Sequence, residues 1–160
     1  MLVYLVGFMA AGKTTVGRKL AKMLGVPFID LDAVIEEAAQ MTIPEIFANE
    51  GEAGFRKRER LALLAKPDKG VIATGGGIVT VPENRCFLKK QPVVYLQADL
   101  SVLRKRIAQT PGTRPLADHK LEERFLQREP LYREVSDLVV DTSGKTADEV
   151  AREVYQWMLR

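Results

Sequence analysis

Residues 7–14 of the chain read GFMAAGKT. Two glycines followed by Lys13 and Thr14 fit the pattern G-x-x-x-x-G-K-[ST], in which the N–H groups of a tight loop surround a phosphate chain. The context agrees, because residues 3–6 form an apolar run of strand length and residues 15–24 repeat apolar side chains with helical spacing. A strand, a phosphate-binding loop and a helix in this order predict an α/β fold with a ligand at the helix N-terminus.

The loop predicts a nucleotide triphosphate and a magnesium ion as ligands. Lys13 is expected to reach the β- and γ-phosphates, and Thr14 is expected to supply a hydroxyl to Mg²⁺. The alternative is a glycine-rich turn that only joins strand to helix, but such a turn does not require lysine followed by threonine. The expected nucleotide contacts are Gly7, Ala10, Ala11, Gly12, Lys13, Thr14 and Thr15.

Four further apolar runs of strand length follow, with helical patterns between them. They lie at residues 27–29, 71–74, 93–96 and 138–140. Because the runs lack polar alternation, they predict strands buried on both faces of a parallel sheet. Capping boxes at Thr42 with Glu45 and at Thr146 with Glu149 each predict the start of a helix. We therefore expect one α/β domain over residues 1–160, with ligands at the carboxyl ends of its strands.

The composition limits the class of protein. A chain of 160 residues with 46% hydrophobic and 28% charged residues is typical of one globular domain and not of a disordered or fibrous chain. One cysteine, Cys86, and one histidine, His119, exclude an internal disulfide and a structural zinc site, and we interpret both as structural or incidental. The apolar runs are far shorter than the roughly 18 residues of a membrane span, so we expect a cytoplasmic protein without a membrane partner.

The net charge leaves two interpretations open. The chain has 24 Lys and Arg against 21 Asp and Glu, a net charge of +3. A basic excess is one property of proteins that bind nucleic acid. Here the basic residues alternate with acidic ones, as in residues 122–124, so a mixed, solvated surface and no nucleic-acid partner are preferred.

Residues 110–120, TPGTRPLADHK, interrupt the alternation of strands and helices. The segment has two prolines, a glycine and no apolar period, and it is longer than most connections in a compact domain. It is a surface loop or a mobile lid, and Arg114 in its middle favours the lid.

Two carboxylates follow the second predicted strand. Asp30 and Asp32 would project to the same side of an extended chain, toward the crevice beside the phosphate loop. The alternative for Asp32 is an N-cap of a helix over residues 33–40. Because a cap needs only one carboxylate, we expect the pair to order the waters of Mg²⁺ and to accept a hydrogen bond or a proton from an attacking hydroxyl.

A run of three glycines, Gly75, Gly76 and Gly77, closes the third predicted strand. Three glycines are costly in chain entropy, so their expected use is close approach by a ligand or a backbone, with a plain turn as the alternative. Arg56, Arg58 and Arg133 lie in predicted helices, where arginines are usually surface residues. A guanidinium nevertheless matches the geometry of a substrate carboxylate.

Residues 141–144, DTSG, match the D-x-x-G pattern of GTP-binding switches. They follow the last predicted strand instead of an earlier one, and no N-K-x-D motif comes after them. We interpret the segment as a polar turn beside the nucleotide base.

Several segments, taken in order over almost the whole chain, resemble the shikimate kinase family. They are residues 7–14, Asp30-Leu31-Asp32, Gly51-Glu52 with Phe55-Arg56, residues 73–77, Arg114-Pro115-Leu116, residues 130–133 and Asp141-Thr142. The resemblance implies a three-layer α/β/α P-loop NTPase fold with five parallel strands in the order 2-3-1-4-5. It also implies a mobile lid at about 110–120 and substrate-binding helices at about 33–65.

The same resemblance implies ATP-dependent phosphorylation of the shikimate 3-hydroxyl, in the pathway to chorismate and the aromatic amino acids. Asp32 would bind the shikimate hydroxyls and act as the base, and Arg56 and Arg133 would hold the carboxylate. Gly76 and its neighbours Gly75 and Gly77 would contact the ring.

Further roles implied by the resemblance concern the phosphates and the base. Thr14 and, through water, Asp30 would hold Mg²⁺, and Arg114 would close from the lid onto the phosphates beside Lys13. Arg106 is the candidate for contact with adenine. Ala10 replaces a glycine that is common in the family's loop, so the loop is expected to be stiffer or differently shaped.

Two other functions remain open from the residues themselves. One is another small-metabolite kinase, for gluconate or a nucleoside monophosphate. Two arginines fit the carboxylates of shikimate and gluconate alike, but they fit a nucleobase poorly. The other is a nucleotide-dependent switch, which the missing N-K-x-D motif and the Asp30 and Asp32 pair disfavour. We expect a monomer with small-molecule partners.

Overall fold

Five parallel strands form a single sheet in the computed structural model, which describes residues 1–109 and 118–160. The order β2-β3-β1-β4-β5 confirms the prediction. Most of the predicted lid falls outside the described residues. The strands are β1 (Leu2–Val6), β2 (Phe28–Asp30), β3 (Gly70–Ala73), β4 (Val93–Gln97) and β5 (Leu138–Asp141).

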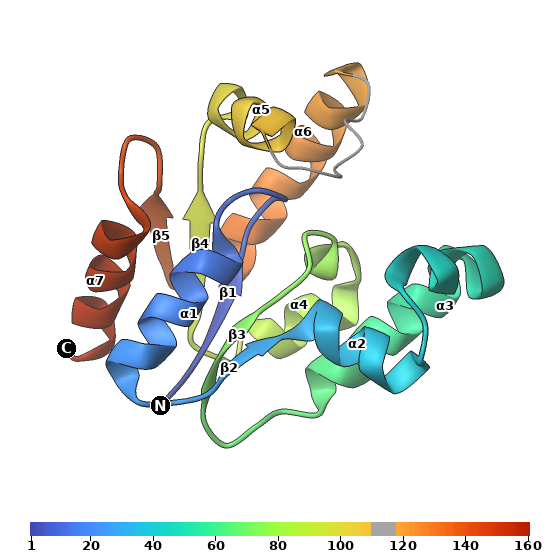
Figure 1. Ribbon diagram of the computed structural model, residues 1–160, viewed down its shortest axis with the longest axis horizontal. Helices are drawn as coiled ribbons and strands as arrows, with labels where there is room; N and C mark the ends of the chain where they lie inside the picture. Colours follow the sequence, from blue (N-terminus) through green and yellow to red (C-terminus); the bar gives the residue numbers. More distant parts are fainter. Residues whose placement is uncertain (110–117) are drawn as a thin grey trace.

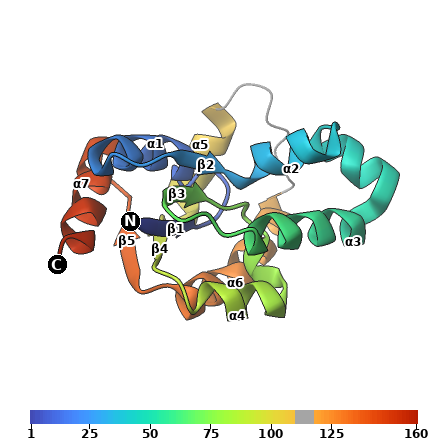
Figure 2. The same cartoon turned by 90° about the horizontal axis from the view of Figure 1, so that it is seen from below.

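Helices cover both faces of this sheet, so the three-layer prediction is also confirmed (Figure 1). Seen from below, α1 (Lys13–Leu24) and α7 (Ala147–Met158) lie on one side of the strands, and α4 (Pro82–Leu88) and α6 (Asp118–Val135) lie on the other (Figure 2). A short 3-10 helix, η1 (Ile78–Thr80), packs against α4 and α6.

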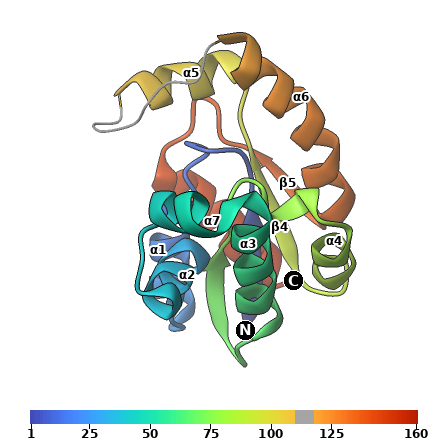
Figure 3. The ribbon, with the colours of Figure 1, turned by 90° about the vertical axis from the view of Figure 1, so that its right-hand side faces the viewer.

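Three helices lie around the carboxyl ends of the strands. Figure 3 shows α2 (Leu31–Ala39) and α3 (Ile43–Leu64) on the near side of the molecule, with α5 (Leu100–Gln109) and the start of α6 above them. None of the helices in the described part of the chain is long and apolar enough to cross a membrane.

The helix starts follow from local capping. The side chains of Thr42 and Thr146 each accept a hydrogen bond from the backbone N–H three residues later. The carboxylate of the glutamate there accepts one from the backbone N–H of the threonine, which confirms both predicted capping boxes. The cap of α2 differs from the prediction. Asp30 Oδ1 accepts the N–H of Asp32 at 3.0 Å, so α2 begins at Leu31 and its cap is Asp30, whereas Asp32 had been considered for that place.

The core lies along the middle of the sheet. Residues 3–6 of β1 and residues 93–96 of β4 are completely or almost completely buried, as strands covered on both faces should be. Because all strands run parallel, their carboxyl ends meet at one edge of the sheet. That edge carries the phosphate loop after β1, Asp30 at the end of β2 and the glycine run after β3.

Candidate active site

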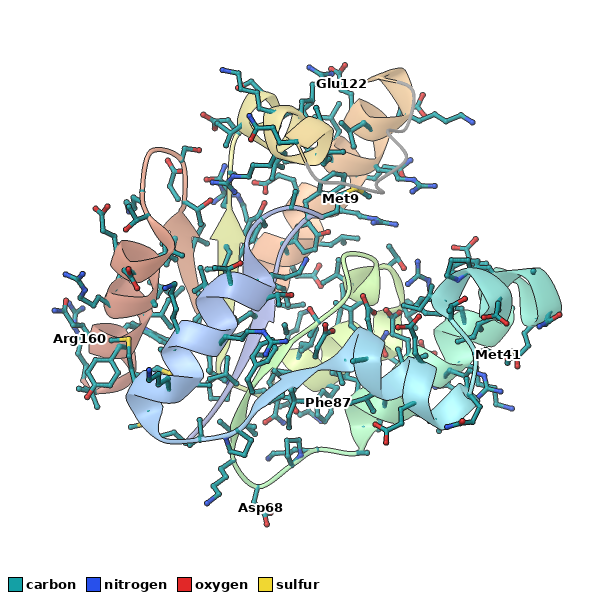
Figure 4. The ribbon with its side chains drawn as sticks, in the orientation of Figure 1. Met9, Met41, Asp68, Phe87, Glu122 and Arg160 are labelled. Carbon is teal, nitrogen blue, oxygen red and sulfur yellow. The ribbon has the colours of Figure 1, made fainter. Side chains whose placement is uncertain are left out.

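The loop between β1 and α1 has the backbone that a phosphate-binding loop requires. Ala10 has a φ of 64°, in the left-handed region that favours glycine, and Gly12 before the helix has a φ of 94°. The loop thus keeps a conformation suited to glycine although Ala10 is present. Figure 4 marks the loop by Met9, below the start of α6, and Asp68 lies at the opposite end of the sheet.

Lys13 lies in the first turn of α1, with its amine directed back at this loop. Its Nζ donates to the carbonyl oxygens of Gly7 and Phe8, the latter at 3.2 Å. Burial lowers the pKa of Lys13 to about 8, although the carboxylates of Asp32 and Asp30 act in the opposite direction. The amine of Lys13, beside the phosphate loop, therefore interacts electrostatically with both predicted acids, Asp32 and Asp30.

Asp32 is half-buried in the first turn of α2. Burial raises the pKa of its carboxyl, and the nearby Asp30 raises it further, while Lys13 and Arg56 oppose the shift. Asp32 therefore holds a proton more readily than an ordinary aspartate. That property suits a group that accepts a proton from an alcohol.

The glycine run leaves room for charged side chains. A Cβ atom on Gly75 would lie 3.0 Å from Oδ1 of Asp32 and 3.1 Å from Oε2 of Glu59. A Cβ atom on Gly77 would lie 2.4 Å from Nη2 of Arg56. The sequence predicted that a ligand or a backbone would approach these glycines closely. In the structure, side chains of the site itself do so, and the segment is therefore more than a plain turn.

Helix α4 holds the segment that follows these glycines. Asn84 is completely buried, and its Nδ2 donates to the carbonyl of Ile78 at 2.9 Å. Arg85 Nη1 donates to the carbonyl of Val79 at 2.7 Å. Cys86, the next residue, is exposed. Side chains of α4 thereby fix η1, and with it the end of the glycine run.

Arg56 extends from α3 to Gly77 as part of an ion pair. Its Nη1 lies 2.8 Å from Oε1 of Glu59, which is only 1% exposed. Burial raises the pKa of Glu59, and the hydrogen bond from Arg56 opposes that shift. Glu59 was not among the residues predicted from the sequence, although its place one helical turn after Arg56 was a usable signal. Arg58, the other candidate on α3, is instead paired with Glu50 at 2.8 Å.

Arg128 enters the same region from α6, and sequence analysis missed it as well. Its Nη1 would lie 3.6 Å from a Cβ atom on Gly76, which the hydroxyl of Tyr132 also approaches, at 3.7 Å, and its guanidinium interacts with that hydroxyl. Burial lowers the pKa of Arg128, and the positive charge of Arg56 contributes in the same direction. Arg56 and Arg128 thus lie against two adjacent glycines, Gly77 and Gly76.

The structure does not bring Arg133 to this group. Its guanidinium is paired with Glu129, lies 5.9 Å from the centre of the Tyr95 ring, and belongs to a side chain that is 51% exposed. Arg133 lies five residues after Arg128, which corresponds to about 140° around a helix, so the two point in different directions. The structure thus places Arg128, and not the predicted Arg133, beside the glycine run with Arg56.

A hollow of about 310 Å³ adjoins the other side of the phosphate loop. Arg106 Nη1 donates to the carbonyl of Ala10 at 3.2 Å and to Oγ1 of Thr142 at 3.3 Å. Thr15 is exposed and also lines this hollow. Arg106 and the turn after β5 thus lie beside the phosphate loop, where a nucleotide base was expected. Arg114 lies outside the described residues.

Comparison with known proteins agrees with this geometry. A sequence model of the shikimate kinase family matches residues 9–159. The chain belongs to the shikimate kinase family. It is 47% identical over 162 aligned residues to the shikimate kinase of Halorhodospira halophila, with 96% of this chain and 91% of the relative covered. The shikimate kinase of a Synechococcus species is 44% identical over 161 residues, with 96% and 82% covered.

Solved structures give the same result. The shikimate kinase of Acinetobacter baumannii in complex with shikimate superposes with a TM-score of 0.89 at 42% identity, covering 98% of this chain and 92% of the other. That of Aquifex aeolicus has a TM-score of 0.89 at 33% identity, covering 99% and 96%. A gluconokinase of Sinorhizobium meliloti, at 16% identity and a TM-score of 0.62, shares the fold alone.

Proposed function

We propose that this protein transfers the terminal phosphoryl group of ATP to the 3-hydroxyl of shikimate, giving shikimate 3-phosphate and ADP, in the pathway to chorismate and the aromatic amino acids. The observation that carries the proposal is the meeting of Asp32, Arg56 and Arg128 around the glycine run, directly beside Lys13. A phosphate-binding loop alone fits many nucleotide enzymes. An acid and two guanidiniums next to it fit a small hydroxylated carboxylic acid as the second substrate.

Substrate recognition divides between two parts of the crevice. Arg56 and Arg128 bind the carboxylate of shikimate from two different helices, so the ring is held at one end. Gly75, Gly76 and Gly77 line the ring between Asp32 on one side and the guanidiniums of Arg56 and Arg128 on the other, since these groups lie against the glycines. Asp32 takes the hydroxyl that is to be phosphorylated.

The chemical step depends on positioning and charge, as in phosphoryl transfer generally. The 3-hydroxyl oxygen attacks the γ-phosphorus, its proton passes to the carboxylate of Asp32, and the bond from that phosphorus to the ADP oxygen breaks. The raised pKa of Asp32 supports its role as the acceptor of this proton. Lys13 exchanges its loop carbonyls for phosphate oxygens and offsets their negative charge. We place Arg114 on the same phosphates, on the resemblance of residues 114–116 to the family.

The residues also suit a magnesium ion. The described residues contain no group of three or more acidic, histidine or cysteine side chains that could hold a metal without other ligands. Mg²⁺ usually retains several waters and takes one or two protein oxygens together with phosphate oxygens, and the exposed Thr14 and the half-buried Asp30 supply such oxygens. When bound there, Mg²⁺ neutralises charge on the β- and γ-phosphates.

The nucleotide and the cellular setting complete the proposal. ATP contacts the loop residues 7–15, and its adenine occupies the hollow beside Arg106. This position is supported because the hollow is lined by both the phosphate loop and Arg106. We also propose a monomer in the cytoplasm that acts on small-molecule substrates, with neither nucleic acid nor a membrane as a partner.

A coupled assay of ADP formation tests the proposal directly. Purified protein with ATP and Mg²⁺ is given shikimate, gluconate or a nucleoside monophosphate in turn. Shikimate is expected to stimulate ADP formation, with shikimate 3-phosphate as the product by mass spectrometry. Stimulation only by gluconate or by a nucleotide would move the protein to another kinase activity. Equal ADP formation with and without each acceptor would favour a nucleotide-dependent switch.

A further inference from the structure

We propose that Tyr132 is a positioning residue for the substrate carboxylate, because its hydroxyl orients the guanidinium of Arg128 beside the glycine run. The inference rests on the proposed function, in which Arg128 binds shikimate. Tyr132 itself has no place in the chemical step.

The contacts of the Tyr132 hydroxyl carry the inference. Tyr132 follows Arg128 by four residues, so both side chains lie on one face of α6. The hydroxyl donates to the carbonyl of Gly76 at 2.5 Å, and it interacts with the guanidinium of Arg128. A phenol has one donor and can accept as well, so its oxygen remains able to accept from Arg128.

Three segments of the site meet at Gly76. A Cβ atom on Gly76 would lie 3.6 Å from Nη1 of Arg128, 3.6 Å from the backbone nitrogen of Met9 and 3.7 Å from the hydroxyl oxygen of Tyr132. The phosphate loop, the glycine run and α6 thus come together within ordinary contact distance. The Tyr132 hydroxyl is the group that hydrogen-bonds two of these three segments to each other.

The ring of Tyr132 has little freedom to move away. Tyr132 is completely buried, and its ring packs against that of Tyr95 at 5.1 Å between centres with 37° between planes. Burial also raises the pKa of Tyr132 well above its ordinary value, so the hydroxyl keeps the proton that it donates to Gly76. The anchor of Arg128 is therefore both fixed in place and neutral.

The neutrality of this anchor explains why a tyrosine holds Arg128, whereas a carboxylate holds Arg56. The Arg56 charge is partly offset by Glu59. Arg128 lies among other positive charges, those of Arg56, Arg124 and Lys13. A phenol orients its guanidinium without neutralising it, so Arg128 keeps its full charge for an anionic substrate. Recognition of a carboxylate by Arg128 then depends on the geometry that the hydroxyl imposes.

Tyr132→Phe removes only the hydroxyl and tests the proposal. We expect the KM for shikimate to rise about five-fold, the effect of one ordinary hydrogen bond, with kcat and the KM for ATP unchanged. Tyr95→Phe is the matched control. It removes the same atom from the neighbouring ring, whose hydroxyl donates to Glu129, and it should leave the KM for shikimate unchanged.

A second background separates positioning from simple loss of structure. In an Arg128→Ala enzyme the Tyr132 hydroxyl has no guanidinium to orient, so adding Tyr132→Phe should change the KM for shikimate no further. Equal increases in both backgrounds would overturn the proposal, as would an unchanged KM in Tyr132→Phe alone. These outcomes are distinct from failure of the proposed function, in which the wild-type protein itself would show no stimulation by shikimate and both inferences would fall.

Discussion

The glycines at residues 75–77 are explained individually by the charged groups that lie on them. Because Gly75 has no side chain, the carboxylates of Asp32 and Glu59 can lie close to it. In the same way, the guanidinium of Arg56 can lie close to Gly77. Glycine at these places is thus required by the positions of other side chains and not by an unusual backbone. A substitution here should affect the neighbouring charge before it affects the fold.

Gly77→Ala is predicted to displace Arg56. The added Cβ would lie 2.4 Å from Nη2 and 2.7 Å from Nη1, so the flexible guanidinium must move. We expect the KM for shikimate to increase by roughly ten-fold or more, since a hydrogen bond to a charged group contributes about 1.5–3 kcal/mol.

Two measurements check the origin of that loss. Thermal unfolding and the KM for ATP should change little, because the clash involves the end of one side chain. In an Arg56→Ala background, Gly77→Ala should have almost no further effect on the KM for shikimate. An additional increase there of similar size would show that Gly77 acts in another way.

The amine of Lys13 is predicted to take up protons when ATP binds. Burial has lowered its pKa to about 8, so at pH 8 about half of the amines are neutral in the nucleotide-free protein. Phosphate anions favour the charged amine and raise this pKa, so binding near pH 8 draws in protons, and affinity for ATP falls as the pH rises above 8. Calorimetry in buffers of different ionisation enthalpy measures the uptake.

Lys13→Arg is the control for this measurement. Its guanidinium remains charged over the whole range, while the nucleotide titrates as before. Proton uptake at pH 8 should therefore be lost in the variant. Uptake of the same size in both proteins would assign the proton to a different group.

At the level of residues, the sequence alone did not distinguish Arg128 from Arg133 as the arginine that lies beside Arg56. Charged residues occupy all sides of α6, and Pro130 lies inside it, so its sequence does not reveal which side faces the crevice. The reason lies in tertiary packing, which turns Tyr132 toward Gly76 and Arg133 toward Glu129. Lys13 was predictable from the phosphate-loop motif that follows β1, and Asp32 because it lies two residues after the end of β2.

At the level of elements, α3 consists of two helical pieces joined at Gly51. This residue has φ 73° and ψ −178°, which are not helical angles, and the second piece carries Arg56 and Glu59. Sequence analysis predicted the start of α3 from its capping box but did not predict the break. A single glycine in a helical pattern is compatible with a continuous helix, so the break was not evident from sequence.

Gly51→Ala and Gly25→Ala form a matched pair that tests the importance of this break. Both glycines are exposed, both have open space where a Cβ would lie, and their φ angles are 73° and 68°. They differ in ψ, which is −178° at Gly51 and 34° at Gly25. The first combination is essentially restricted to glycine, whereas the second is only unfavourable for alanine.

We expect Gly25→Ala to lower the free energy of unfolding by about 1 kcal/mol, and Gly51→Ala by up to about 3 kcal/mol, both measured by urea unfolding. Only Gly51→Ala should also raise the KM for shikimate, because it changes the direction of the piece that carries Arg56. Equal losses of stability would show that the chain at Gly51 adjusts to a different ψ without cost.

For the molecule as a whole, the sheet was the most predictable part. Each predicted strand lies within two residues of the observed one, because all five strands are largely apolar runs. Burial on both faces is confirmed for β1, β3 and β4 but not for the edge strands, since β2 is only half-buried and β5 is partly exposed. The strand order came from family resemblance and is confirmed. The grouping of Glu59, Arg128 and Tyr132 could not be predicted, since it depends on helices that are distant in sequence and meet only in the folded protein.

The position of Cys86 has a practical consequence for experiments. It is the sole thiol of the sequence, it is exposed, and it lies on α4 beside Asn84 and Arg85, which hold η1 after the glycine run. A maleimide dye would therefore attach at one defined point without any engineered cysteine. Its fluorescence would report substrate-induced shifts of the glycine run from outside the crevice, in real time.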